Sequence, residues 1–174
     1  RLFVYDLVST LQVIALDAKV QVVFNSEVVS RYRLIGFENR AIADEDFRNN
    51  QVDAAEIGAG HAVTALYEIK RYAGARGEIA TVQLRWQDPD TYRVEEISQT
   101  FDTRDLENSF RRADPYFQLD VLVAEFGEIL RNSYWADGSS LRDLLPYADD
   151  LLDRLENQQV VEFVQLLEDA SRLH

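Results

Sequence analysis

The chain contains 174 residues, and its 31 acidic and 18 basic side chains give a net charge of −13. This balance argues against binding to nucleic acid or to an anionic membrane surface, because both require clustered lysine and arginine. The sequence has no cysteine, which excludes disulfides and thiolate metal sites, and no apolar run approaches the length of a membrane span.

The first predicted element is a helix with an unusually broad apolar surface. Apolar side chains in residues 2–16 recur at helical spacing around most of the circumference. A helix of this kind is normally buried on several sides, so Phe3, Leu7 and Leu11 are predicted to contact another module or a second copy of the chain. We therefore expect an N-terminal helix over residues 1–17 and self-association through it.

Between residues 18 and 103 the apolar positions alternate with polar ones, as in half-buried strands. Turn residues separate the segments 78–86 and 92–101, which predicts an antiparallel hairpin. An interruption of the alternation in the second arm predicts a β-bulge near Glu95 or Glu96. Several short strands without a helix between them favour an antiparallel sandwich.

The remainder of the chain returns to helical spacing and predicts three amphipathic helices. Gly138 separates the first helix from the second, which Ser139 or Ser140 can cap. Pro146 predicts a kink in the second helix or a later start of it. The predicted fold class is α+β, with an N-terminal helix (1–17), an antiparallel β-sandwich-like layer (18–103) and a three-helix layer (104–174).

The sequence contains few residues that suggest catalysis. His61 would have to serve as the base of a Ser–His–carboxylate triad, but no G-x-S-x-G motif supplies the nucleophile. Gly58 and Gly60 begin a dinucleotide-binding pattern whose third glycine is replaced by Val63. We therefore interpret His61 as a hydrogen-bonded structural residue and predict no catalytic residue and no cofactor.

An acidic segment around residues 44–57 is the best candidate for a binding loop. Its spacing differs from that of a calcium-binding loop, because Arg48 stands where a short acidic ligand is required. The segment 137–141 also departs from the metal-binding pattern D-x-S-x-S at its last position, so no metal site is predicted. Binding specificity often lies on loops that a rigid sheet supports. The candidate residues are Asp44, Glu45, Asp46, Phe47, Asp53, Glu56 and His61.

Most aromatic side chains fall on the inward side of predicted strands and are interpreted as core, among them Trp86 and Tyr92. Phe47 and Tyr72 fall in predicted loops instead. These two rings are therefore the candidates for exposed stacking surfaces.

Three stretches resemble a known family: residues 16–47, 53–69 and 114–133. They resemble the C-terminal region of bacterial von Willebrand factor type A (vWA) proteins of the YfbK type, where a vWA domain precedes a domain of unknown function. The resemblance implies that this chain lies downstream of a vWA module and that residues 1–17 correspond to the end of that module. It also implies a location in the cell envelope.

The sequence thus predicts a noncatalytic accessory domain of a vWA module, which recognises another protein or orients the vWA domain. Two alternatives remain open. A hydrolase would require His61 within hydrogen-bond distance of a serine hydroxyl and a carboxylate in a cleft. A carbohydrate-binding sandwich would require coplanar exposed rings on one face of a sheet, and inward-facing Trp86 and Tyr92 would count against it.

Overall fold

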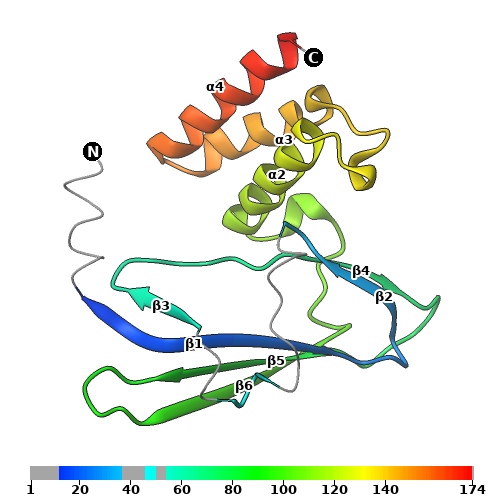
Figure 1. Ribbon diagram of the computed structural model, residues 1–174. Helices are drawn as coiled ribbons and strands as arrows, with labels where there is room; N and C mark the ends of the chain where they lie inside the picture. The colour runs from blue at the N-terminus through cyan, green and yellow to red at the C-terminus, as the bar shows by residue number, and fades with distance from the viewer. Residues whose placement is uncertain (1–11, 37–45, 50–53, 174) are drawn as a thin grey trace. The chain divides into compact units, whose positions relative to one another are not determined.

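The computed structural model describes residues 12–36, 46–49 and 54–173, and it divides the chain into two compact units. The first unit, Arg1–Leu106, contains all the described strands, and the second, Glu107–His174, contains all the described α-helices (Figure 1). The predicted α+β class is confirmed. The predicted N-terminal helix, with Phe3, Leu7 and Leu11, lies outside the described residues.

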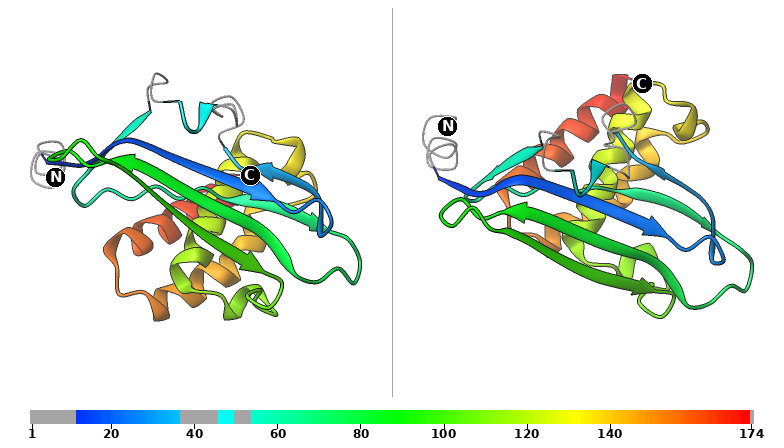
Figure 2. Two further views of the ribbon diagram at one scale, coloured as in Figure 1. Left: turned by 90° about the horizontal axis from the view of Figure 1, so that it is seen from below. Right: turned by 60° about the horizontal axis from the view of Figure 1, so that its bottom comes forward.

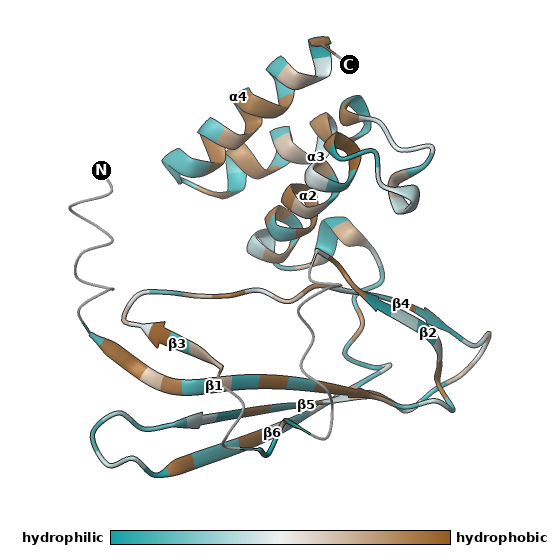
Figure 3. Ribbon diagram, viewed as in Figure 1, coloured by the Kyte–Doolittle hydropathy of each residue, from teal (hydrophilic) through white to brown (hydrophobic). Residues whose placement is uncertain are grey.

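An antiparallel sheet of four strands in the order β3-β1-β5-β6 forms the main layer of the first unit (Figure 2). Its strands are β1 (Val13–Phe24), β3 (Ala55–Gly58), β5 (Glu78–Gln87) and β6 (Val94–Asp102). Hydropathy alternates in the middle of β1, as a strand with two different faces requires, and both ends of the strand are apolar (Figure 3). β1 and β5 are the central strands, so β3 and β6 form the two edges.

β5 and β6 form the predicted hairpin. A continuous register joins them from Gln87 and Val94 at the turn to Ala80 and Phe101 at the far end. The Asp88 carboxylate accepts two backbone N–H groups of the turn, at 3.0 and 2.7 Å. This is the local hydrogen bonding for which aspartate is favoured at the start of a turn.

The bulge predicted near Glu95 or Glu96 is wrong. The change of phase needs no bulge, because Val94 and Ile97 are three residues apart and therefore lie on opposite faces of one unbroken strand. Tyr92 lies in the turn with a φ of 56° and is not part of the strand. Its side chain therefore does not share a strand face with Val94. The register shift lies at the opposite end of the hairpin, between Glu78 and Ala80 on β5.

The first unit also contains a two-stranded antiparallel sheet of β2 (Val29–Leu34) and β4 (Tyr67–Arg71). Phe24, the last residue of β1, stacks on Tyr32 with ring centroids 4.2 Å apart and meets Tyr67 edge-on at 5.3 Å. A small buried core lies beside these rings and consists of Val28, Val29, Ile79 and Ala80. The described strands thus form a four-stranded and a two-stranded sheet, and the β-sandwich stays a prediction.

The second unit consists of α2 (Pro115–Leu130), α3 (Leu141–Arg154) and α4 (Gln158–Leu173), which confirms the three predicted helices. Two short 3₁₀ turns, Phe110–Arg112 and Tyr134–Ala136, precede α2 and α3. Within the described ranges, no helix combines the length and the apolar character needed to cross a bilayer.

The starts of α2 and α3 follow from the local sequence. Asp114 caps α2 by accepting two backbone N–H groups, and Pro115 occupies the first helical turn, where its missing N–H costs nothing. Ser140 and Asp143 form a capping box at the start of α3, which confirms Ser140 as the cap. α3 begins before Pro146 and contains it, so the later start considered from the sequence is wrong.

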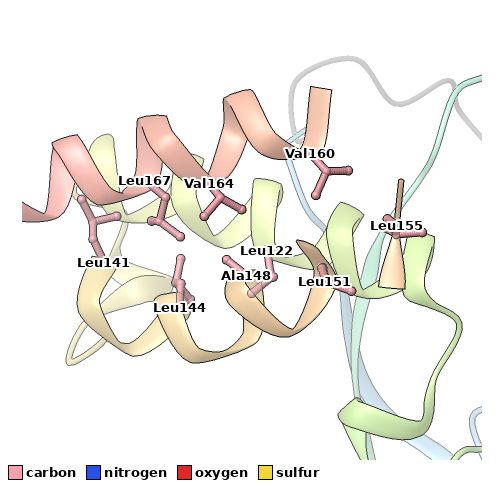
Figure 4. Packing of buried hydrophobic residues seen from close by; sticks show 9 residues of the cluster. All are labelled: Leu122, Leu141, Leu144, Ala148, Leu151, Leu155, Val160, Val164 and Leu167. Atoms are coloured by element: carbon pink, nitrogen blue, oxygen red, sulfur yellow. The ribbon is translucent and has the colours of Figure 1, made fainter. Parts of the chain in front are cut away.

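The helices pack around an aliphatic core (Figure 4). Leu151 of α3 and Leu167 of α4 are completely buried, and Leu122 supplies the contact from α2. The core consists of Leu122, Leu141, Leu144, Ala148, Leu151, Leu155, Val160, Val164 and Leu167. Burial of these stripes accounts for the stability of helices that would be marginal in isolation.

Candidate functional site

The strand register sorts the side chains of β1, β5 and β6 onto two faces of different character. One face carries the cross-strand row of Lys19, Arg85 and Glu96. The other face carries the row of Val20, Leu84 and Ile97. The polar face consists of Lys19, Gln21, Val23, Thr81, Gln83, Arg85, Glu96, Ser98 and Thr100. The apolar face consists of Val20, Val22, Phe24, Ala80, Val82, Leu84, Trp86, Glu95, Ile97, Gln99 and Phe101.

The polar face holds residues 46–49, which we call the clip segment. Lys19 is only 6% exposed, and its Nζ donates a hydrogen bond of 2.6 Å to the backbone carbonyl of Asn49. The Arg48 guanidinium pairs with the Glu96 carboxylate at 2.7 Å. Two strands of the sheet therefore hold this part of the predicted binding loop through one buried and one exposed cation.

Two predicted binding residues serve this packing instead. Phe47 is 4% exposed, so its prediction as a surface aromatic is wrong. Burial of a phenylalanine ring stabilises the folded state by about 1.5–3 kcal/mol. This gain accounts for the burial of Phe47, although its neighbours have a composition typical of a turn. The Asp46 carboxylate accepts a hydrogen bond of 3.0 Å from the Asn49 side chain within the clip segment. Tyr72, the other predicted surface aromatic, is 54% exposed, as predicted.

His61 and Glu56 lie near the other edge of the sheet. Glu56 is exposed on β3, and His61 is exposed directly after it. Among the described residues the His61 side chain has no hydrogen-bond partner, so its interpretation as a hydrogen-bonded structural residue is wrong. The remaining predicted residues, Asp44, Glu45 and Asp53, lie outside the described ranges.

The contact between Arg48 and Glu96 should weaken in acid. The hydrogen bond from Arg48 holds the pKa of the Glu96 carboxyl below its usual value of 4.5. The pKa of Glu96 is lower in the folded state than in the unfolded state. The contact therefore stabilises the fold fully at a pH above the usual pKa, and this stabilisation is lost as the pH falls through the lowered pKa. We expect the Arg48 Nε resonance in NMR spectra to shift over this acidic range. In Glu96→Gln the shift should be absent, and an identical titration in both proteins would contradict the assignment.

The apolar face is open to solvent over much of its area. Val20 and Ile97 are each 58% exposed although they lie in the same cross-strand row as Leu84. Val82 and Phe101 in the adjoining rows are also exposed. Single apolar side chains on a surface are ordinary, whereas a contiguous patch marks a contact site. The alternation in the sequence predicts half-buried strands, so the exposure of this face was not expected from the sequence.

The connection between α2 and α3 presents a second surface, which sequence reasoning missed. Tyr134 is 81% exposed and Trp135 48% exposed, and their rings meet edge-on at 5.4 Å. Tyr134 lines a groove of about 700 Å³. Glu128 is buried beneath the connection, accepts a hydrogen bond of 2.7 Å from Ser133 and pairs with Arg131. The signal that could have indicated this surface is a pair of adjacent aromatics outside the helical stripes.

The incomplete D-x-S-x-S pattern lies in this connection and serves the helix start. The Ser140 backbone N–H donates to the Asp143 carboxylate at 3.0 Å as part of the capping box of α3, and the Ser140 hydroxyl donates to the same carboxylate at 2.7 Å. Among the residues that the structure describes, no group of three or more histidine, aspartate or glutamate side chains is placed to hold a metal ion.

The two units and their surfaces can be compared with known proteins. The family described as "Uncharacterized protein YfbK, C-terminal" matches residues 9–173. The chain belongs to this family. A curated relative, "Uncharacterized protein YfbK" of Escherichia coli (strain K12), is 29% identical over 178 residues, which cover 89% of this chain and 29% of the relative. The chain thus spans less than a third of the length of this relative. No solved structure matches the chain.

Proposed function

We propose that this domain is a noncatalytic interaction module of a longer protein and that it recognises another protein through the apolar face of its sheet. The observation that carries the proposal is the exposure of Val20, Val82 and Ile97 side by side on adjacent strands. The accessory relation to a vWA module in the cell envelope, predicted from the family resemblance, belongs to this proposal.

The apolar face has the properties of a recognition surface. Full burial of one valine or isoleucine side chain is worth about 1.5–3 kcal/mol, so covering a row of them provides a strong driving force for association. The hydrogen-bonded strands β1, β5 and β6 hold these side chains in fixed positions, which lowers the entropy lost on binding. Glu95 and Gln99 lie among them at the outer strand and supply polar groups at the rim.

The placement of His61 favours this role over the hydrolase. A catalytic base requires a partner that orients the imidazole and a nucleophile within hydrogen-bond distance. The His61 side chain is exposed and has neither among the described residues. Tyr92 lies in a turn, so it does not form a flat aromatic platform with Trp86 on the sheet, as a carbohydrate-binding face would require.

Val20 and Val23 provide a matched pair for testing the proposal. Both are valines of β1 with similar exposure, 58% and 51%, but they lie on opposite faces of the sheet. A photo-crosslinking residue at position 20 of the full-length protein should capture a discrete partner in its native cells, and one at position 23 should not. Mass spectrometry identifies the captured protein.

The identified partner then allows an affinity measurement. Val20→Lys should weaken binding by at least about tenfold, because it places an ammonium in a desolvated apolar contact, whereas Val23→Lys should leave binding unchanged. Equal capture at both positions, or an unchanged affinity of Val20→Lys, would show that the apolar face is not the recognition surface.

A further inference from the structure

Among the residues that the structure describes, the outer edge of β6 is unpaired. β6 hydrogen-bonds to β5, and no described strand lies beyond it in the sheet. Every residue from Val94 to Phe101 is exposed. The row of backbone N–H and C=O groups along this edge is a template for pairing with another chain.

Apart from its acidic residues, β6 lacks the devices that normally protect such an edge. Its nine residues contain no proline, lysine or glycine, and its register with β5 is unbroken from Val94 to Phe101. The opposite edge strand, β3, has only four residues and pairs with β1 through two register shifts. Short and irregular edges resist strand addition, whereas long and regular ones permit it.

The hydrogen-bond pattern identifies the backbone groups that point outward. In an antiparallel ladder, hydrogen-bonded residue pairs alternate with non-hydrogen-bonded pairs. The Asp88 N–H donates to the Arg93 carbonyl at 2.9 Å, and this bond shows which pairs of the β5–β6 ladder are hydrogen-bonded. The Asn25 N–H donates to the Ile79 carbonyl at 2.9 Å and does the same for the β1–β5 ladder, and both ladders give the same direction for each N–H group of β5. They direct the N–H groups of Glu95, Ile97 and Gln99 toward β5 and leave those of Glu96, Ser98 and Thr100 pointing outward.

The charge on β6 indicates what kind of segment fits. The strand carries Glu95, Glu96 and Asp102 and no basic residue. Glu95, beside Ile97 at the rim of the apolar face, has no ion-pair partner among the described residues. A net charge of −13 on the chain opposes pairing with a second copy.

From these observations we propose that the β6 edge takes up an extended basic segment of a partner protein as a fifth strand of the sheet. The segment's apolar side chains would continue the apolar face next to Ile97 and Phe101, and its alternating lysine or arginine side chains would lie on the polar face beside Glu96. Main-chain hydrogen bonds supply affinity in this mode of recognition, and alternate side chains supply specificity. The inference rests on the proposed function, of which it names the partner chemistry.

Ser98 allows a sharp test. Because its N–H points outward, Ser98→Pro removes a donor that an added strand needs while every β5–β6 ladder bond stays intact. Ser98→Ala keeps this donor and is the matched control. The probe is a nine-residue peptide in which valine and lysine alternate, matched in length to β6. Binding is measured by fluorescence anisotropy on the whole chain.

The peptide should bind the parent chain and Ser98→Ala equally, and Ser98→Pro about tenfold or more weakly. A peptide with glutamate in place of lysine should also bind more weakly. Absence of binding at about 1 mM peptide, or equal binding to Ser98→Pro, would overturn the inference.

Amide hydrogen exchange provides a second measurement that needs no variant. The peptide should protect the N–H groups of Glu96, Ser98 and Thr100, whereas those of Ile97 and Gln99, already bonded to β5, should gain little. Protection elsewhere in the chain without protection at these three would also overturn the inference. If Val20→Lys abolishes partner binding but Ser98→Pro does not, the edge inference fails while the proposed function holds.

Discussion

Replacement of Leu167 by alanine should lower the free energy of unfolding of the helical unit by about 2–5 kcal/mol. Leu167 is completely buried in the aliphatic core of α2, α3 and α4. The substitution removes buried methyl and methylene groups and leaves a cavity that neighbouring helices fill only in part. A loss of this size is a large fraction of the stability of a small unit.

Leu166→Ala is the matched control for this prediction. Leu166 is the adjacent residue of the same helix and is 55% exposed, so its replacement should change the free energy of unfolding by less than about 0.5 kcal/mol. Chemical denaturation followed by circular dichroism measures both. Equal losses for the two variants would mean that the face of α4 assigned to the core is wrong.

Replacement of Ile79 by alanine should have the corresponding effect on the strand unit, a loss of about 2–5 kcal/mol. Ile79 is 1% exposed and belongs to the small core that joins the end of the main sheet to the two-stranded sheet. That core has few buried members, which are Val28, Val29, Ile79 and Ala80. Few neighbours can therefore compensate for the lost side chain.

Ile97→Ala serves as the control, because it removes the same atoms from a residue of β6 that is 58% exposed. Its effect should stay within about 1 kcal/mol, the range of strand propensity at exposed sites. Hydrogen exchange should show faster opening of the strands in Ile79→Ala, while α2–α4 remain protected, because the two buried clusters share no residue. Similar losses for both isoleucine variants would contradict the assigned core.

The contrast between these isoleucines also bears on function. Ile79 and Ile97 occupy strands of one hairpin, yet one is buried and the other lies in an open apolar face. An isoleucine that contributes little to stability but extends a row of exposed apolar side chains is available for a partner. Stability measurements on Ile97→Ala and binding measurements on Val20→Lys therefore separate the folding role of the sheet from its recognition role.

Local chemistry made much of the fold predictable from sequence. The leucine stripes of α3 and α4, the capping residue Ser140 and the turn between β5 and β6 depend on neighbours within a few residues, and all were confirmed. Tyr92 shows the limit of this approach. The sequence pattern counts Tyr92 as a strand residue on the face of Val94, but its left-handed backbone places it in the turn, and period-two spacing does not show where a strand begins.

Contacts between distant segments were decided only by the tertiary structure. Phe47 lies in a segment with the composition of an exposed loop, yet Lys19, from a strand far earlier in the chain, holds the backbone around it against the sheet. Local alternation, by contrast, places Val20 and Ile97 on the opposite face of the sheet from Lys19 and Glu96. Whether a face is covered depends on which other segments reach it, and period-two alternation contains no information about that. The sequence by itself therefore determined most of the described elements and the alternation of faces along β1 and β5, while the burial of Lys19 and Phe47 and the exposure of the apolar face came from packing between segments that are remote along the chain.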